Sequence, residues 1–358
     1  MNLNDFIDND EEIVEFMEWE RRPHIVQNRI NHFDKWDELD FFRRFHLKKQ
    51  TVLIILEQIE NIIETPTDRN LAIRPIDKLL LTLRFYALGT MLIATGDFAG
   101  VSKSSACNIV RHVSIAIAQL APQYIKMSSN ADEISNARIK FYNRARVPRI
   151  IGAIDCTHVR IQSPSGINAE LFRNRKGYFS LNVQTVSSAD LKILDIVARW
   201  PRSVHDQTIF NNSRVKERLE NNEFGNSLLV GDSGYTNTMF VITPLLNTHN
   251  DIEELYNEAI IRTRNPVERQ YGVWKRRFPI LALGLRLKLQ TSMAIVVATA
   301  ILHNIAYERN EELPSQDADL CIDQHILNED WDAQPLQPDD RHINARAQLI
   351  ADYFPNLL

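Results

Sequence analysis

The sequence predicts an α/β fold in which a sheet-containing region follows a helical N-terminal region. Residues 43–113 repeat apolar side chains at helical spacing, but from Arg149 onward short β-rich runs alternate with helical ones. The chain has 358 residues, of which 44% are apolar and 24% charged. This length is enough for one large domain or two smaller ones, so we expect an ordinary globular protein.

Three helical segments are expected before the sheet. Arg43–Glu64 is amphipathic, with apolar residues three and four positions apart, whereas Ile76–Leu92 is more uniformly apolar and should be more buried. In Asp97–Val113 a short helix is followed by a turn, and Ser102 is a suitable N-cap for a second helix that begins at Lys103.

This last segment has the pattern of a helix-turn-helix. Its second helix should expose, at its start, the residues that such motifs present to the major groove of DNA: Lys103, Ser104, Ser105 and Asn108. Its inward-facing residues should be Val101, Ala106, Ile109, Val110 and Val113. A helical hairpin used only for packing would give the same pattern, so both interpretations stay open.

From Arg149 onward the β-rich runs are expected to be strands. Helical patterns lie between the third and fourth run, at Asp206–Glu220, and after the fifth, at Ile261–Phe278. Met293–Tyr307 is almost wholly apolar and should be a core helix packed on the sheet. The expected strands are Ile150–Ile161, Tyr178–Ser187, Ile193–Trp200, Ser227–Val230 and Met239–Ile242.

Three regions follow from this order of elements. Residues 1–136 should form the helical N-terminal region, 137–310 the sheet-containing domain, and 311–358 an acidic C-terminal tail with scattered prolines. We expect Ala131–Val147 to link the first two regions, and a short helix at Asn344–Tyr353.

No targeting or membrane segment is expected. The N-terminal sequence MNLNDFIDNDEEIVEF lacks the basic flank and apolar core of a secretory signal, and no stretch approaches 18 uninterrupted apolar residues. Cys107, Cys156 and Cys321 are few, odd in number and far apart, which fits a reducing compartment and neither a disulfide framework nor a zinc site. Cys156 is expected to fill space in a strand, because no His/Cys arrangement supports a nucleophile.

The net charge of −5 conceals a split along the chain. Residues 137–290 hold 23 basic and 14 acidic side chains, a net of +9, whereas 1–136 hold 15 and 20 and 311–358 hold 2 and 11. A basic surface on the sheet-containing region suits a polyanionic substrate. Chance clustering would give the same imbalance, so this interpretation depends on the acidic residues within that region.

Three acidic residues occur where separate elements can bring them together. Asp232 follows an apolar run in a glycine-flanked turn (LLVGDSGY), and Asp155 ends another apolar run (RIIGAID). Glu268 lies in a helical stretch 36 positions after Asp232. Each residue alone is equally typical of a structural turn or helix surface, so the hypothesis of a shared site depends on their combination.

Carboxylates from separate elements are what two-metal phosphoryl transfer requires. If the first and fourth strands are neighbours, Asp155 and Asp232 lie side by side, and Glu268 can reach them from the helix. The same helix carries four cations that are candidate phosphate contacts: Arg269, Lys275, Arg276 and Arg277.

Four acidic motifs follow one another along this region. They are GAIDCTHVRI with Asp155, WPRSVHDQTIF with Asp206, LLVGDSGY with Asp232, and TRNPVERQYGVWKRRF with Glu268. Together they resemble the DDE domain of Harbinger-type transposases, and most of all the domesticated, transposase-derived nucleases of animals. The likeness covers roughly Arg149–Tyr307 and extends upstream to GVSKSSACNIV, which looks like the helix-turn-helix segment of that family.

The resemblance implies an RNase H-like mixed sheet, Mg²⁺ or Mn²⁺ as the cofactor, and DNA as the substrate. It makes Asp155, Asp232 and Glu268 the catalytic triad and Asp206 a further metal ligand, although an acid that opens a helix is also typical of a simple cap. It further implies a separate Myb/SANT-type DNA-binding partner protein and a location in the nucleus, with the cytoplasm as a second location. A homo-oligomer stays open.

The chain departs from the family pattern at three positions. Arg202 replaces a turn glycine, Ser188 stands where an aspartate is common, and Ile260 stands where a histidine is common. His158 and His205 flank the acidic residues, either as hydrogen-bond donors to the site or as structural histidines.

The leading hypothesis is therefore a divalent-metal-dependent DNA endonuclease descended from a transposase. The rival is a domesticated DNA- or protein-binding module that kept the fold and lost turnover, which the three departures favour. A sugar-phosphate hydrolase on an unrelated α/β sheet would need a phosphate-binding glycine loop, and the chain has no GxGxxG or Walker pattern.

Overall fold

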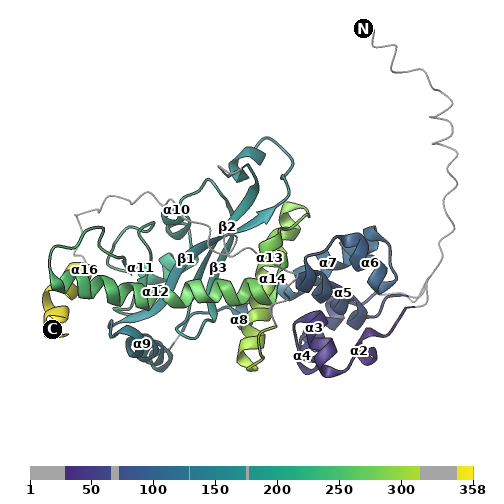
Figure 1. Cartoon of the computed structure of the whole chain (residues 1–358), viewed down its shortest axis with the longest axis horizontal. Helices are drawn as coiled ribbons and strands as arrows, with labels where there is room; N and C mark the ends of the chain where they lie inside the picture. The colour runs from purple at the N-terminus through teal and green to yellow at the C-terminus, as the bar shows by residue number, and fades with distance from the viewer. Residues whose placement is uncertain (1–28, 66–71, 129, 175–176, 315–344, 358) are drawn as a thin grey trace, which may run out of the picture.

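The computed structural model describes residues 29–65, 72–128, 130–174, 177–314 and 345–357. Helices α2 to α7 gather at one end of the molecule, and the sheet lies at the other, with the long helix α12 running across it (Figure 1). Helix α14 lies between these two parts and contacts both, through α7 and through β3.

The N-terminal helices surround a shared apolar core. The amphipathic segment predicted as one helix at Arg43–Glu64 is two helices, because the chain turns at His46, whose backbone is left-handed (φ 58°). The His46 ring nitrogen Nδ1 bonds to the backbone carbonyl of Arg277, and the backbone carbonyl of His46 accepts a hydrogen bond from the Arg277 guanidinium. These tertiary contacts outweigh the local helical preference. The helices are α2 (His32–Lys35), α3 (Glu38–Phe45), α4 (Lys49–Ile63), α5 (Pro75–Leu88), α6 (Leu92–Ala99), α7 (Lys103–Ala118) and α8 (Ala121–Tyr124).

Helix α5 ends earlier than the predicted Leu92 because Gly89 closes it. Gly89 has a left-handed backbone (φ 61°), and a Cβ added there would lie 2.6 Å from Leu283 Cδ1. Only glycine meets both conditions without strain, so the helix stops at Leu88.

The pattern of helix, turn and helix is confirmed as α6 and α7. The Ser102 hydroxyl accepts a hydrogen bond from the backbone N–H of Ser105 at 3.1 Å, which makes it the predicted N-cap. The residues predicted to face inward are buried or half-buried: Val101, Ala106, Ile109, Val110 and Val113.

The described residues form a mixed sheet with the strand order β3-β2-β1-β4-β5. Strands β1 and β2, and β2 and β3, pair antiparallel, whereas β1 and β4, and β4 and β5, pair parallel. This mixed sheet, with helices packed on it, confirms the predicted α/β fold. The strands are β1 (Ile150–Ile161), β2 (Phe179–Ser187), β3 (Ile193–Pro201), β4 (Leu228–Val230) and β5 (Val241–Ile242).

Helices α10 and α12 cover opposite faces of the sheet. The Thr185 hydroxyl of β2 bonds to Tyr271 of α12, whereas Cys156, which pairs with the preceding residue Gln184, packs on Ile209 of α10. Neighbouring strand residues point to opposite faces, so the two helices lie on different sides.

In the sheet-containing domain, two predicted helical segments differ in extent from the observed ones, and a segment predicted as a link is largely helical. The segment predicted at Asp206–Glu220 breaks into two helices around Asn212, and α12 begins ten residues before the predicted Ile261. The linking segment Ala131–Val147 is largely a helix, α9, which packs on β1. These helices are α9 (Ala131–Ala145), α10 (Asp206–Asn211), α11 (Arg214–Glu220), α12 (Asp251–Arg277) and α13 (Ile280–Leu283), with the 3₁₀ turn η2 (Ala169–Phe172).

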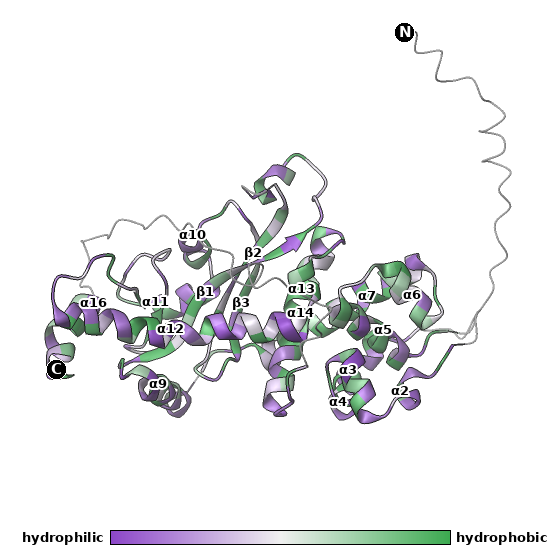
Figure 2. Ribbon diagram, viewed as in Figure 1, coloured by the Kyte–Doolittle hydropathy of each residue, from purple (hydrophilic) through white to green (hydrophobic). Residues whose placement is uncertain are grey.

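Helix α14 (Leu289–Glu308) is the predicted core helix. It is apolar along most of its length (Figure 2). Among the described helices it is long and apolar enough to cross a membrane by composition, but 72% of its most apolar stretch is buried inside the protein. Its apolar character therefore serves packing against α7, α8 and β3.

The start of the acidic tail is fixed to the core. Glu311 is buried and forms an ion pair with Arg277 at 3.5 Å, and Arg277 also donates to the carbonyl oxygens of His46 and Glu312. At the C-terminus Phe354 packs edge-on against Tyr256 of α12. The short helix predicted at Asn344–Tyr353 corresponds to α16 (Ala345–Gln348) and η3 (Leu349–Tyr353), followed by η4 (Phe354–Leu357); Asn344 lies outside the described residues.

Candidate metal centre

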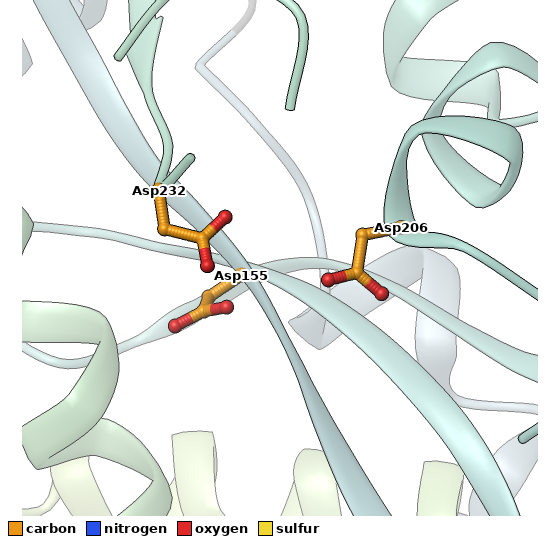
Figure 3. Close-up of side chains that lie close together, drawn as sticks. All are labelled: Asp155, Asp206 and Asp232. Atoms are coloured by element: carbon orange, nitrogen blue, oxygen red, sulfur yellow. The ribbon is translucent and has the colours of Figure 1, made fainter. Parts of the chain in front are cut away.

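Three carboxylates converge beside the parallel pair β1 and β4. Among the residues that the structure describes, Asp155, Asp206 and Asp232 each offer an oxygen, and these oxygens lie within 4.8 Å of one another. The side chains point toward one another from three elements: β1, the start of α10 and the turn after β4 (Figure 3). The chain thus concentrates acidic groups from positions up to 77 residues apart in one place.

The strand register explains why Asp155 and Asp232 meet. The parallel pairing of β1 with β4 matches Ala153 to Val230, and each aspartate lies two residues further along its own segment. Although Asp155 ends the apolar run RIIGAID, it lies in the middle of β1, which continues to Ile161 along β2 as the predicted strand range does. Strand β4, in contrast, ends at Val230, and the turn that follows it leaves room for the acidic group beside β1.

The turn that carries Asp232 needs Gly231 for space and uses the backbone N–H of Gly234 for a hydrogen bond. The predicted turn is present, because the Tyr235 N–H donates to the Asp232 carbonyl at 3.2 Å, although neither Gly231 nor Gly234 has a left-handed backbone. A Cβ on Gly231 would lie 2.9 Å from the ring of Tyr235, so close packing requires the glycine. The Gly234 N–H donates to Asp232 Oδ1 at 3.0 Å and so orients the carboxylate.

Asp206 is not the N-cap of α10, which is His205. Asp206 is the first residue of α10, is only 5% exposed, and its Oδ1 accepts a hydrogen bond from Asn182 Nδ2 of β2 at 3.0 Å. This bond aims its carboxylate at the sheet, toward Asp155 and Asp232.

Burial and mutual repulsion raise the pKa values of these three carboxyl groups. Burial, helped by the charge of Asp232, raises the pKa of Asp155 well above its usual range. Burial raises the pKa of Asp206 to about 6, and it also raises the pKa of Asp232. Crowded carboxylates that lack solvent favour a compensating cation, and oxygen donors of this kind fit Mg²⁺ or Mn²⁺.

Glu268, the third predicted triad member, is not among the carboxylates that converge within 4.8 Å, and Arg264 links it to Asp155. Arg264 Nη1 donates to Asp155 Oδ2 at 3.0 Å, and Arg264 Nη2 forms a very short contact with Glu268 Oε1. Sequence reasoning missed Arg264. Its position one helical turn before Glu268, on the same face of α12, is the signal that could have revealed it.

Tyr271, one turn after Glu268, was also missed. Its hydroxyl donates to the backbone carbonyl of Asp155 at 2.7 Å and accepts from the Thr185 hydroxyl at 3.0 Å. The backbone N–H of Cys156 donates to Asp155 Oδ1 at 2.8 Å. Asp155 is therefore fixed both by its backbone and by its side chain, which is how a rigid ligand set is built.

The predicted basic flank of α12 needs a correction. Lys275 and Arg277 are buried, with 4% and 3% exposure, so they do not offer a surface to phosphates. Lys275 Nζ donates to the His158 carbonyl at 3.3 Å, and burial lowers the pKa of Lys275 to about 8. Arg269 is exposed, and Arg276 is half-buried and donates to the Pro314 carbonyl.

The candidate DNA-contacting residues of α7 lie at its exposed start. Lys103, Ser104 and Asn108 are exposed. Ser105 is half-buried, and its hydroxyl accepts a hydrogen bond from Ser102 at 3.0 Å. The surface is available, and its role in binding stays a prediction.

The three positions that depart from the family pattern lie in different surroundings: a turn, the core and the vicinity of a buried histidine. The Ser188 hydroxyl accepts from the backbone N–H groups of Asp190 and Lys192 and so shapes the turn between β2 and β3. Ile260 is fully buried in the core. The pKa of His158 is lowered to about 3, mainly by burial and to a smaller extent by the positive charge of the neighbouring Arg202.

The remaining residues beside the acids divide clearly by exposure. His205 is exposed and makes no side-chain cap for α10. Cys156 is 2% exposed, and its Sγ lies 3.5 Å from the Tyr235 hydroxyl, which confirms that it fills space in β1. Cys321 lies outside the described residues.

Residues 154–304 match the DDE superfamily endonuclease family. The mixed sheet and the acidic site lie within or beside the matched residues, and the match confirms the resemblance seen in the sequence.

Curated relatives extend this likeness beyond the domain. The chain is similar to "Putative nuclease HARBI1" of Rattus norvegicus, with 28% identity over 336 residues that cover 93% of this chain and 95% of the relative. The protein of the same name from Homo sapiens is 28% identical over 295 residues, 82% of this chain and 84% of the relative. "Protein ALP1-like" of Arabidopsis thaliana is 23% identical over 275 residues, 70% and 65%. No solved structure matches the chain.

Proposed function

We propose that this protein is a transposase-derived, divalent-metal-dependent DNA endonuclease that hydrolyses phosphodiester bonds by a two-metal DDE mechanism. The observation that supports it best is the convergence of Asp155, Asp206 and Asp232 within 4.8 Å. The family match over residues 154–304 and the relatives named as nucleases point the same way.

The side chains of the site have distinct roles in this proposal. Asp155, Asp206 and Asp232 would hold Mg²⁺ or Mn²⁺, and Glu268 would complete the site from α12. A bound divalent cation would lower the pKa of the attacking water and stabilise the leaving oxygen. The hydrogen bonds from Gly234 and Asn182 hold two of the carboxylates in place beforehand, so little reorganisation is needed.

DNA would contact two exposed surfaces. One is the start of α7, with Lys103, Ser104, Ser105 and Asn108, and the other is the surface of α12 that carries Arg269 and Arg276. The excess of basic residues in 137–290 supports a polyanionic substrate.

A nicking assay tests the proposed activity. Supercoiled plasmid is incubated with the purified full chain in Mg²⁺ or Mn²⁺, and the nicked and linear forms are quantified. We expect nicking that EDTA abolishes and that Asp232→Asn reduces at least about 100-fold, because a metal ligand is lost. The matched control is Asp190→Asn, a surface aspartate paired with Lys140, which should leave nicking unchanged.

The second candidate is a DNA- or protein-binding module with the DDE fold and little turnover. The observation that favours it is the pairing of Arg264 with both Asp155 and Glu268, which satisfies part of the acidic charge without a metal. Binding of plasmid without nicking, in wild type and Asp232→Asn alike, would support this module and count against the nuclease.

We further propose a nuclear location, with the cytoplasm as a second location, and a Myb/SANT-type partner protein that supplies target recognition. This follows only from the family resemblance. Proximity labelling in cells tests it, and enrichment of cytoplasmic proteins alone would contradict it.

A further inference from the structure

Arg264 connects one member of the acidic group, Asp155, with Glu268 of α12. Its Nη1 is 3.0 Å from Asp155 Oδ2, its Nη2 contacts Glu268, and its side chain is only 20% exposed. Glu268 itself is 53% exposed, so the arginine joins a buried acid to a solvent-facing one.

The contact with Asp155 uses the oxygen that a metal ion would also need. Asp155 Oδ1 already accepts the Cys156 N–H at 2.8 Å, and Arg264 occupies Oδ2. A divalent cation and a guanidinium repel each other strongly at contact distance in a partly buried site. Both cannot remain close to Oδ2 at once.

The contact with Glu268 does not face the same conflict. Arg264 and Glu268 are four residues apart on one face of α12, so they can stay paired after the guanidinium has left Asp155. Pro266 lies between them and lacks the N–H that would close the helix at that point, so this turn of α12 is held by fewer backbone bonds.

We propose that Arg264 is the resident counter-ion of the metal-free site: it neutralises Asp155, holds Glu268 beside it, and is displaced from Asp155 when a divalent cation binds. This inference rests on the proposed function, because it assumes that the acidic group is a metal site. Arg264 is thus a positioning residue that competes with the metal.

If Arg264 competes with the metal ion, removing its charge should strengthen metal binding. Most substitutions beside a metal site weaken metal binding, because they disturb the ligands. Arg264→Gln should instead tighten the binding of Mn²⁺ about tenfold in the absence of DNA, since the competing charge is gone. Arg264→Lys keeps the charge and should remain within about threefold of wild type.

The experiment measures Mn²⁺ affinity directly. Full-length wild type, Arg264→Gln, Arg264→Lys and Asp155→Asn are titrated with Mn²⁺ at constant ionic strength, and free Mn²⁺ is followed by electron paramagnetic resonance. Arg262→Gln is the matched control, because Arg262 lies on the same helix, is exposed and pairs only with Glu258 among the contacts that the structure describes. Its Mn²⁺ affinity should equal that of wild type.

Thermal unfolding supplies a second readout. In EDTA, Arg264→Gln should melt several degrees below wild type, since its buried carboxylates lose their counter-ion. Saturating Mn²⁺ should remove most of that difference. Arg262→Gln should match wild type in both conditions.

The outcomes separate this inference from the proposed function. If wild type binds Mn²⁺ through Asp155 but Arg264→Gln binds equally well or more weakly, competition is wrong and the metal site stands. If neither wild type nor Arg264→Gln shows binding that Asp155→Asn abolishes, the metal site is wrong and the inference is overturned with it. Binding that appears only in Arg264→Gln would support the counter-ion in its strongest form.

Discussion

His303 is a single buried residue whose protonation state should control stability in mild acid. Its Nε2–H donates to the Leu191 carbonyl at 2.8 Å, and burial, with a smaller contribution from Arg277, lowers its pKa from 6.5 to about 4. Between these values the unfolded chain binds more protons than the folded one. The stability that neutral His303 contributes is therefore complete above pH 6.5 and is lost progressively as the pH falls from 6.5 to about 4.

This gives a pH-dependent prediction. On going from pH 7.5 to pH 5, wild type should lose on the order of 2 kcal/mol more free energy of unfolding than His303→Gln, which cannot titrate. Urea unfolding at several pH values measures the difference. His112→Gln changes an exposed histidine and should follow wild type. Parallel curves for wild type and His303→Gln would contradict the prediction.

Tyr271 gives a second prediction at the residue scale. Tyr271→Phe removes the hydroxyl that joins the Asp155 carbonyl to Thr185. The Asp155 carbonyl and the Thr185 hydroxyl would each lose a buried hydrogen-bond partner, so the free energy of unfolding should fall by about 1–3 kcal/mol. The substitution should also reduce nicking roughly tenfold, because Asp155 is less well oriented.

Chemical denaturation and the plasmid assay measure these two effects. Tyr307→Phe, at an exposed tyrosine, is the control and should change neither. Normal nicking by a destabilised Tyr271→Phe would show that this hydroxyl serves folding alone.

The sequence was most informative about residues at the ends of apolar runs. Asp155 and Asp232 could be placed together because parallel neighbours bring equivalent positions to one edge. The spacing of Arg264 and Glu268 along α12 indicates their pairing, but the contacts of Arg264 and Tyr271 with Asp155 could not be predicted, because they depend on how α12 lies across the sheet. The burial of Lys275 and Arg277 depends in the same way on tertiary packing, which the charge pattern of the helix does not contain.

At the scale of elements, the cap of α7 is a local feature with a measurable effect. Ser102→Ala removes the hydroxyl that accepts from the Ser105 N–H. It should lower the free energy of unfolding by about 1 kcal/mol. The exposed Ser104→Ala is the matched control and should have an effect within about 0.5 kcal/mol. Equal effects of the two substitutions, measured by urea unfolding, would show that the cap contributes nothing.

Strands were predicted more accurately than helix ends. All five strands lie close to their predicted ranges, because an apolar run between turn residues is a local signal. The breaks at His46 and near Asn212 were missed, since amphipathic spacing continues across both. The break at His46 is fixed by Arg277, which is 231 residues away and which no local window contains.

At the scale of the whole molecule, the buried pair of Arg277 and Glu311 ties the N-terminal helices to α12. Glu311 also accepts from the Lys48 N–H at the start of α4. Glu311→Gln should destabilise the protein by about 3–5 kcal/mol, because a buried arginine loses its partner. The double variant Arg277→Met with Glu311→Gln should recover part of that loss, which thermal unfolding can show.

Glu312→Gln, at the exposed neighbour, is the control for this pair. A loss for Glu311→Gln no greater than that for the control would mean that the ion pair contributes little and that apolar packing alone joins the two parts.

Helix α14 touches both α7 and β3. Because one helix packs against both elements, it should hold α7 at a fixed distance from the sheet that carries the acidic site. If α7 reads a DNA sequence, the scissile bond should fall at a constant offset from that sequence, with little tolerance for extra base pairs in between.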